Sequence, residues 1–294
     1  MKLNELVKSI EGLRMRGPAA GAAQIPGREV NSVSCNSREN LRDAVFVAVK
    51  GAQSDGHAYI QDALRRGAAA VVFEDSRRIS LPLQGQAEES RAVFIQVSDS
   101  RSALVSLAEA FYGYPARALS VVGITGTNGK TTISYLIEAL ARQAGKKPAV
   151  IGTVNYRYND TVISSANTTP GPVDLQRLFK NMVDSGAGLL AMEVSSHALD
   201  QGRVAGIRFC AAIFTNLTQD HLDYHNGLEE YFEAKAKLFT GLDSDAAAII
   251  NKDDPYGRRL CEKSRGRVIT YGLDDTAQVY ARGISMNTES TRFT

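Results

Sequence analysis

The sequence is poor in cysteine and has no long apolar run. Its 294 residues include three widely spaced cysteines, Cys35, Cys210 and Cys261, an odd number that favours reduced thiols over a disulfide framework. The first 16 residues mix charges into their apolar positions, which is not the pattern of a secretory signal peptide. No apolar stretch approaches the roughly 20 residues that span a membrane. We therefore expect a cytoplasmic protein with no membrane partner.

The sequence also lacks an excess of charge of either sign. It has 34 Lys and Arg residues against 32 Asp and Glu residues, a net charge of +2. Nucleic-acid-binding domains usually carry a basic stripe, whereas here only isolated pairs such as Arg65-Arg66 and Lys146-Lys147 occur. We therefore expect no nucleic-acid partner. The 44% apolar and 22% charged residues are typical of a globular protein, and the length fits about two domains.

The stretch VVGITGTNGKTT at residues 121–132 is the most informative part of the sequence. The β-branched residues at its start predict a buried strand, and apolar residues at helical spacing over 133–140 predict a helix after it. A glycine loop between a strand and a helix is the context of a nucleotide phosphate loop. The common pattern has glycine six positions before the lysine, and Ile124 stands there instead. From the context we nevertheless predict a phosphate loop.

In such a loop, backbone N–H groups and the positive end of the helix attract phosphate oxygens. Lys130 would reach the β- and γ-phosphates of the nucleotide, and the Thr131 hydroxyl would bind Mg²⁺.

Predicted strands and helices alternate after residue 118. Strands are expected at 118–123, 148–152, 188–193, 209–214, 246–250 and 267–271, and helices at 131–143, 172–184, 228–240 and 254–262. This alternation predicts an α/β fold with a mostly parallel sheet and helices on both faces. The segment 279–294 resembles a strand leading into a hairpin. Because the sequence stops there, we expect the domain to be incomplete.

A smaller α/β domain is predicted before this one. Strands are expected at 30–34, 44–49, 68–73 and 93–97, and helices at 3–13, 57–66 and 100–111. Tyr-Gly-Tyr-Pro at 112–115 ends the last of these helices. We therefore predict two domains, 1–115 and 116–294.

Polar residues follow two of the predicted strands. Glu193 ends strand 188–193, and ligands collect at the carboxyl ends of parallel strands, so Glu193 could bind Mg²⁺ or hold a water. It could also simply face solvent. Two Asp and two His lie within 220–225, with His221 and His225 at the spacing of a helical zinc pair. Leu222 occupies the glutamate position of His-Glu-x-x-His, which argues against a zinc protease. One His could instead serve a hard metal or phosphate, or the segment could be a polar helix start capped by Thr218 or Asp220.

Two further patterns are ambiguous by composition alone. Lys235 lies on the predicted helix 228–240, on a different face from Phe232 and Phe239, which favours a solvated side chain. The hydroxyl-rich loop 167–172 could bind phosphate or sugar, or could only cap the helix that follows. Ser37, in the first domain, is similarly ambiguous.

Taken together, these stretches resemble the ATP-dependent muramyl peptide ligases of cell-wall synthesis. The resemblance spans about 30 to 272, and the glycine pattern of the phosphate loop is the one this family uses. It rests on Asn36-Ser37-Arg38, Asp55-Gly56-His57, Gly126 to Thr132, Asn167 to Pro170, Glu193 to Leu199, Asp220 to His225 and Glu233-Ala234-Lys235. The family usually has Asp at the position of Asn36, which weakens the match in the first domain.

The resemblance implies an N-terminal UDP-binding domain, a central ATPase domain and a C-terminal Rossmann-like domain that this sequence lacks. It implies a magnesium-dependent ligase of peptidoglycan synthesis, and so a role in cell shape and division. The enzyme would add a third amino acid, with meso-diaminopimelate favoured over L-lysine, to UDP-N-acetylmuramoyl-L-alanyl-D-glutamate through an acyl phosphate. We expect a monomer.

The resemblance also implies site residues. Ser37, Ala52, Gln53 and Ser54 would hold the UDP end, while Asn167, Thr168, Thr169, Ser195, Gln201 and Arg203 would position the muramoyl peptide. Gly126, Thr127, Asn128, Gly129, Lys130, Thr131 and Thr132 would bind ATP. Thr131, Glu193, His221 and a carbamylated Lys235 would serve the Mg²⁺ ions, and Lys130, Lys235 and His221 would be catalytic.

Three alternatives stay open. A folylpolyglutamate synthetase-like ligase shares the ATPase core of this family but would not need the first domain. An unrelated ATPase or kinase would not need Lys235. The chain as given could also be an inactive fragment that still binds substrate.

Overall fold

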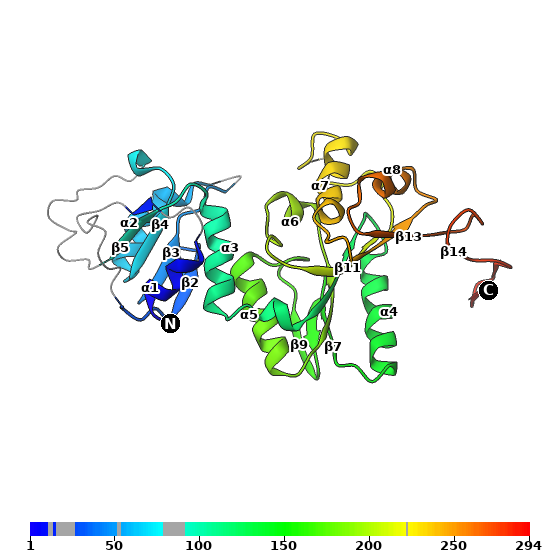
Figure 1. Ribbon diagram of the computed structural model, residues 1–294, viewed down its shortest axis with the longest axis horizontal. Coiled ribbons are helices and arrows are strands. Elements are labelled where there is room, and N and C mark those ends of the chain that lie inside the picture. The colour runs from blue at the N-terminus through cyan, green and yellow to red at the C-terminus, as the bar shows by residue number, and fades with distance from the viewer. Residues whose placement is uncertain (11–13, 16–26, 52–53, 79–91, 222) are drawn as a thin grey trace. The chain divides into compact units, whose positions relative to one another are not determined.

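The computed structural model describes residues 1–294 except 11–13, 16–26, 52–53, 79–91 and 222 (Figure 1). The chain divides into two compact units, one of Met1–Pro115 with Pro172–Arg177 and one of Ala116–Gly171 with Leu178–Thr294. Ala52 and Gln53, two of the residues expected to hold UDP, lie outside the described residues. Among the described residues, none of the helices has the length and apolar character needed to cross a membrane.

The first unit contains a five-stranded sheet of order β1-β5-β4-β3-β2, in which only β1 is antiparallel. Its strands are β1 Arg14–Met15, β2 Ser32–Ser34, β3 Ala44–Val47, β4 Ala70–Phe73 and β5 Val93–Gln96, and its helices are α1 Leu3–Leu6, α2 Ile60–Arg65 and α3 Ser100–Phe111. Apolar side chains alternate along β3. Val45 packs with Leu107 of α3 in one core cluster, and Phe46 packs with Ile60 of α2 in the other. Both faces of the sheet are therefore buried, as expected for parallel strands.

The second unit contains a nine-stranded sheet of order β14-β13-β12-β11-β6-β10-β7-β8-β9. Its strands are β6 Ser120–Thr125, β7 Pro148–Ile151, β8 Asn155–Tyr158, β9 Thr161–Ser164, β10 Leu189–Glu193, β11 Phe209–Phe214, β12 Ala247–Asn251, β13 Arg267–Gly272 and β14 Val279–Tyr280. Its helices are α4 Lys130–Gln143, α6 Ser196–Asp200, α7 Leu228–Thr240 and α8 Pro255–Lys263. Helix α5, Pro172–Asp184, belongs to the second unit only from Leu178 on. Every strand pair is parallel except β7 with β8 and β8 with β9.

The helices cover both faces of this second sheet. Ile124 of β6 packs in one cluster with Ile133 and Ile137 of α4. The neighbouring Gly123 faces the opposite way, and a Cβ there would lie 3.3 Å from Leu238 of α7. The predicted α/β class and the mostly parallel sheet are confirmed.

Most predicted elements are confirmed to within one or two residues, and α3, α5, α7 and β11 have the predicted bounds. The expected helix over 3–13 is wrong in its length, because α1 ends at Leu6 and a short 3₁₀ turn, Val7–Ser9, follows it. The β8–β9 hairpin and α6 were not predicted. Strand β9 is exposed at all four positions and so lacks an apolar pattern, and α6 has only five residues, too few to show a helical period. The C-terminal strand and hairpin are confirmed as β14 and the pair β15 Ser285–Met286 and β16 Thr291–Arg292.

Two side-chain expectations in the second unit are wrong. The described residues of 218–225 form no helix, with a turn at Asp223 and Tyr224, and the next helix begins only at Leu228. No helix therefore starts at Thr218 or Asp220, and His221 and His225 are not a helical pair. Lys235 is buried rather than solvated, with 1% of its surface exposed. On α4, Leu136 shares the helical spacing of Ile133 and Ile137 but faces outward.

Candidate active site

The glycine loop joins the central strand β6 to α4, as its sequence predicts. Gly126 and Gly129 have positive φ values of 142° and 83°, and a Cβ on Gly126 would lie only 1.9 Å from the Thr215 hydroxyl. Glycine is therefore required at position 126 by both backbone conformation and space.

Residues that follow β11 fix the shape of this loop. The Thr127 N–H donates to the Asn216 carbonyl at 2.8 Å, and the Asn128 N–H donates to the Asn216 side-chain oxygen at 3.0 Å. The Thr215 hydroxyl donates to the Asn128 carbonyl at 2.7 Å. Strand β11 lies beside β6 in the sheet, so the carboxyl end of one strand supports the loop that follows the other.

Two lysines converge on one carbonyl oxygen of the loop. Lys130 Nζ donates to Gly126 O at 2.9 Å, and Lys235 Nζ of α7 donates to the same oxygen at 3.0 Å. Lys235 Nζ also lies 4.3 Å from the ring centroid of Tyr231. Burial, reinforced by the charge of Lys130, lowers the pKa of Lys235 well below its usual 10.5. Burial also lowers the pKa of Lys130, although Glu193 and Asp220 oppose that shift.

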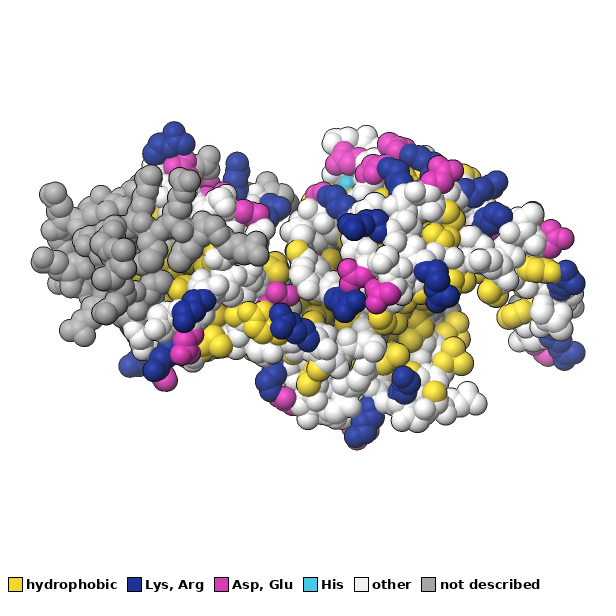
Figure 2. Space-filling model, viewed as in Figure 1, with side chains coloured by type: hydrophobic (Ala, Val, Ile, Leu, Met, Phe, Trp, Pro, Cys, Tyr) yellow, Lys and Arg dark blue, Asp and Glu magenta, His cyan; other side chains and the backbone are white. Residues whose placement is uncertain are grey.

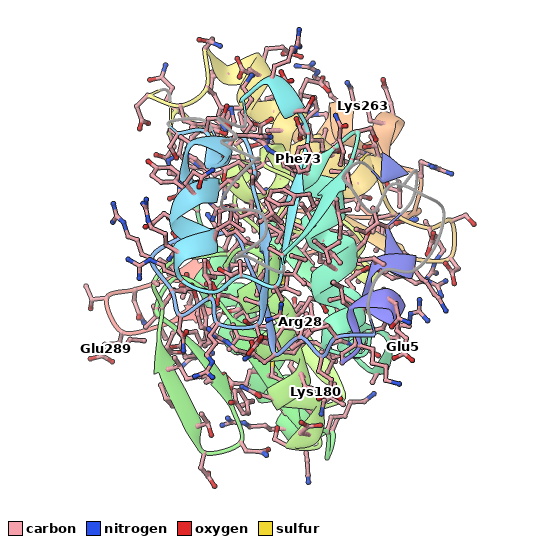
Figure 3. The ribbon with its side chains drawn as sticks, turned by 90° about the vertical axis from the view of Figure 1, so that its left-hand side faces the viewer. Glu5, Arg28, Phe73, Lys180, Lys263 and Glu289 are labelled. Atoms are coloured by element: carbon pink, nitrogen blue, oxygen red, sulfur yellow. The ribbon has the colours of Figure 1, made fainter. Side chains whose placement is uncertain are left out.

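Lys235 differs from two exposed helical lysines of its unit. Figure 3 labels Lys180 of α5 and Lys263 of α8, whose side chains are 46% and 39% exposed and pair with Asp184 and Glu233. An exposed ion pair of this kind contributes little to stability, whereas a buried lysine needs a partner. Lys235 contacts the Gly126 carbonyl of the loop and the Tyr231 ring.

Glu193 lies at the carboxyl end of β10, between β6 and β7 in the sheet. It is 1% exposed. Its Oε1 accepts the Thr153 N–H at 3.2 Å, and its Oε2 accepts the Thr153 hydroxyl at 2.9 Å. The solvent-facing alternative for this glutamate is wrong.

The hydroxyl-rich loop 167–170 is tied to the same strand end. The Thr169 hydroxyl donates to Glu193 O at 2.9 Å and accepts the Ser195 N–H at 3.1 Å. Arg203 donates to Thr169 O at 2.9 Å and holds the Gln201 side-chain oxygen with two of its nitrogens. Ser195 caps α6 by accepting the Ala198 N–H at 3.2 Å. These bonds connect four residues that were expected to position substrate into one network, namely Thr169, Ser195, Gln201 and Arg203.

The histidines occupy the loop between β11 and α7. His221 has φ 53° and a half-exposed side chain whose Nε2 lies 3.6 Å from Asp220. His225 is buried, its ring centroid lies 5.3 Å from that of Tyr231, and neither ring nitrogen has a hydrogen-bond partner among the described residues. Burial lowers the pKa of His225 and of His197, whose ring contacts Tyr224 at 4.0 Å between centroids.

No group of three or more His, Cys, Asp or Glu side chains in the described ranges could hold a metal ion by itself. That is compatible with Mg²⁺, which keeps several waters and takes one or two carboxylates plus phosphate oxygens. Glu193 has a buried carboxylate of this type close to the glycine loop, near enough to act on the Lys130 charge. The donor set therefore fits a magnesium ion that is bound together with a nucleotide.

Part of the first unit is built around His57. Its Nδ1 lies 2.6 Å from Asp55 Oδ1, and its Nε2 accepts the Glu74 N–H at 3.0 Å. Ser54 follows the undescribed pair 52–53, and its carbonyl accepts the Gly51 N–H at 2.8 Å. Ser37 is buried.

Several residues that shape the site were not singled out by the sequence reasoning. They are Thr153, Thr215, Asn216 and Tyr231, together with Asp220, which was expected only as a possible helix cap or as part of the Asp220 to His225 motif. Thr153 and Thr215 each follow the end of a predicted strand, so the rule that ligands collect at strand ends could have found them. Tyr231 lies one turn before Lys235 on the same helix face and carries no other signal.

Residues 124–294 match the family described as "Mur ligase middle domain", and residues 29–112 match "Mur ligase family, catalytic domain". The chain belongs to the Mur ligase family. This Mur ligase chain is 44% identical over 290 residues to the UDP-N-acetylmuramoyl-L-alanyl-D-glutamate–2,6-diaminopimelate ligase of Geobacter sulfurreducens, an alignment that covers 97% of the chain and 54% of the relative. The Mur ligase chain thus spans about half the length of the curated relatives it matches.

Solved structures of related proteins are also similar to this chain. A structure of a UDP-N-acetylmuramoyl-L-alanyl-D-glutamate–2,6-diaminopimelate ligase superposes with a TM-score of 0.75 at 29% identity, covering 92% of this Mur ligase chain and 54% of that chain. A folylpolyglutamate synthase of Mycobacterium tuberculosis, complexed with ADP and AMPPCP, gives a TM-score of 0.51 at 15% identity and covers 64% of this chain and 50% of that chain. The second likeness is one of fold alone.

Proposed function

We propose that this chain binds ATP and a UDP-muramoyl peptide as part of a ligase that adds diaminopimelate to UDP-N-acetylmuramoyl-L-alanyl-D-glutamate. The observation that carries the proposal is the meeting of Lys130 and Lys235 on the Gly126 carbonyl, beside a buried Glu193 at a neighbouring strand end. The names of the relatives supply the substrate and the added amino acid.

The proposal assigns a ligand to each part of the chain. Residues 1–115 would bind the UDP end through Ser37 and the 52–54 loop. Residues 116–294 would bind ATP through Gly126 to Thr132. The muramoyl peptide would contact a separate set of residues of the second domain, which comprises Asn167, Thr168, Thr169, Ser195, Gln201 and Arg203. The biological setting would be peptidoglycan synthesis by a cytoplasmic monomer, in support of cell shape and division.

In the first step, a carboxylate oxygen of the D-glutamyl residue attacks the γ-phosphorus of ATP. A P–O bond to the acyl oxygen forms while the bond to the bridging oxygen of ADP breaks. Because both reactants are anionic, their approach requires positive charge at the γ-phosphate. In this chain, Lys130 would supply it after leaving the Gly126 and Thr127 carbonyls that it now contacts.

Magnesium, when bound, would neutralise the phosphate charge and orient the γ-phosphate. Thr131, Glu193 and His221 are the proposed ligands, together with Lys235 once it is carbamylated. Carbamylation requires a neutral amine, and the lowered pKa of Lys235 favours that form.

In the second step, the neutral amine of diaminopimelate attacks the acyl carbon and a tetrahedral intermediate forms. It collapses by expelling phosphate, and the nitrogen loses a proton to give the amide. The developing oxyanion needs hydrogen-bond donors or cations.

Binding of a fluorescent ATP analogue tests the nucleotide part of the proposal. We expect saturable binding that depends on Mg²⁺. Lys130→Ala should weaken it at least tenfold, because hydrogen bonds to charged groups contribute about 1.5–3 kcal/mol. Lys180→Ala, which removes an exposed lysine of α5, is the matched control and should bind like the wild type. Equal affinity of the Lys130 variant and the wild type would contradict the assignment.

A further inference from the structure

Thr153 occupies the carboxyl end of β7, next to the strand that ends in Glu193. Strands β7 and β10 pair in parallel, with Ile151 opposite Met192. Thr153 lies two residues beyond Ile151, and Glu193 lies one residue beyond Met192. Their side chains therefore meet above the sheet edge, although they are forty positions apart in the sequence.

Both carboxylate oxygens of Glu193 are bonded to this one residue. The Thr153 N–H reaches Oε1 at 3.2 Å and the Thr153 hydroxyl reaches Oε2 at 2.9 Å. Two bonds to a single residue fix the plane of the carboxylate as well as its position. Side chains that hold a metal ligand in this way orient it for the ion.

The Thr153 hydroxyl also lies 3.1 Å from the Thr168 hydroxyl. An ionised carboxylate can only accept hydrogen bonds, so the Thr153 proton points to Glu193. A hydroxyl has one proton, so Thr153 must accept the proton of Thr168. The result is a directed chain from the 167–170 loop, through Thr153, to Glu193.

The residue before Thr153 is shaped by the same carboxylate. A Cβ on Gly152 would lie 2.3 Å from Glu193 Oε1 and 3.0 Å from its Cδ. Real Cβ atoms do not approach other atoms so closely, so any other residue at position 152 would displace Glu193. The Gly152-Thr153 pair is thus fitted to the glutamate by its space as well as by its hydrogen bonds.

We propose that Thr153 is a positioning residue that orients Glu193 for the cation and links it to the substrate loop through Thr168. This inference rests on the proposed function. It means that Mg²⁺–nucleotide binding and the ordering of the 167–170 loop are coupled through one hydroxyl group, and coupling of two sites is reciprocal.

The test measures the Mg²⁺ concentration that half-saturates binding of the fluorescent ATP analogue. Thr153→Val keeps the shape and the backbone N–H but removes the hydroxyl, and it should raise this concentration about tenfold. Thr153→Ser restores the hydroxyl and should stay within about twofold of wild type. Thr161→Val, at an exposed position on β9, is the matched control and should leave the value unchanged.

A double variant tests the directed chain. Thr168→Val alone should raise the half-saturating Mg²⁺ concentration, by less than Thr153→Val does. In the Thr153→Val background it should add nothing, because the link to Glu193 is already broken and residues in one network act non-additively. Independent, multiplicative effects of the two changes would overturn the proposed link.

The outcomes separate this inference from the proposed function. If the wild-type chain binds the analogue with Mg²⁺ dependence but Thr153→Val behaves identically, the inference fails and the proposed function stands. A lowered melting temperature with an unchanged Mg²⁺ dependence would show a structural role only and would also overturn it. If the wild type shows no Mg²⁺ dependence, the proposed function fails and the inference fails with it.

Discussion

Lys235 is a basic residue whose side chain is almost completely buried. It is 1% exposed, and its usual positive charge is opposed by burial and by Lys130. A lysine with a lowered pKa binds fewer protons in the folded chain than in the unfolded chain, over the range between its folded pKa and 10.5. Stability therefore rises with pH across that window, and the penalty for burying the charge is largest below it.

Lys235→Met should remove this penalty. We expect the variant to melt higher than the wild type at pH 7, by at least about 2 °C, because an apolar side chain replaces a buried charge. The advantage should shrink as the pH rises towards 10.5. The measurement is the difference in melting temperature between the two proteins from pH 6 to 10, in buffers free of carbon dioxide so that the amine stays unmodified. A difference that is constant with pH would contradict the assigned shift.

A second prediction concerns the space around Gly152. Gly152→Ala places a Cβ 2.3 Å from the Glu193 carboxylate, and overpacking of this kind costs about 1–3 kcal/mol of unfolding free energy. Gly188→Ala, where a Cβ would meet nothing within 4 Å, is the matched control and should change stability by less than about 0.5 kcal/mol. Urea denaturation of both variants measures the difference, and equal stabilities would show that Glu193 moves aside without cost.

Single residues were predictable where the chemistry is contiguous in the sequence. Residues 126–132 lie on consecutive positions between a predicted strand and a predicted helix, so local sequence and its context together indicate a phosphate loop. Thr153 and Glu193 meet only because β7 and β10 are neighbours, and the order of strands in a sheet cannot be read from local pattern. The prediction for Lys235 was wrong for a related reason, since the loop carbonyl that accepts its hydrogen bond is 109 positions away.

At the scale of elements, a buried ion pair joins α4 to β8. Glu138 of α4 contacts Arg157 of β8 at 2.6 Å, and the two side chains are 7% and 10% exposed. The Arg157 guanidinium also lies 3.8 Å from the centre of the Tyr135 ring. The pair connects the helix that begins at the phosphate loop to the hairpin that leads into the 167–170 loop.

Glu138→Gln should therefore be strongly destabilising. It leaves Arg157 buried without its carboxylate, and removal of one partner of a buried pair costs about 3–5 kcal/mol. Glu262→Gln, at an exposed position of α8, should lie within about 0.5 kcal/mol of wild type. The free energy of unfolding in urea distinguishes them, and a loss of less than 1 kcal/mol for Glu138→Gln would argue that the pair is not the tie between these elements.

Long amphipathic helices and strands rich in apolar residues were predictable, whereas short elements without an apolar pattern were not. Helices α3, α5 and α7 have 12 or 13 residues, and each repeats its apolar positions over about three turns. Strand β9 is exposed at all four positions, so it has no buried face to produce an alternating pattern. His221 and His225 have helical spacing, but the described residues around them are irregular, and the next helix begins at Leu228.

At the scale of the whole chain, charge is distributed without a dominant sign. Figure 2 shows Lys and Arg side chains interspersed with Asp and Glu on the face drawn, consistent with a net charge of +2. Under the proposed function, recognition of the anionic substrates would then come from local groups such as Arg203 and Lys130, not from a broad field.

The most direct test of the central claim is a calorimetric titration of this chain with UDP-N-acetylmuramoyl-L-alanyl-D-glutamate, with UDP alone as the comparison. We expect saturable binding that is tighter for the whole substrate than for UDP, because residues of both domains are assigned to the whole substrate. Lys130→Ala should retain this binding, since Lys130 is assigned to ATP. Absence of binding by a chain that is folded by circular dichroism would contradict the assignment of Ser37, Thr169 and Arg203, and would leave only a nucleotide-binding fold.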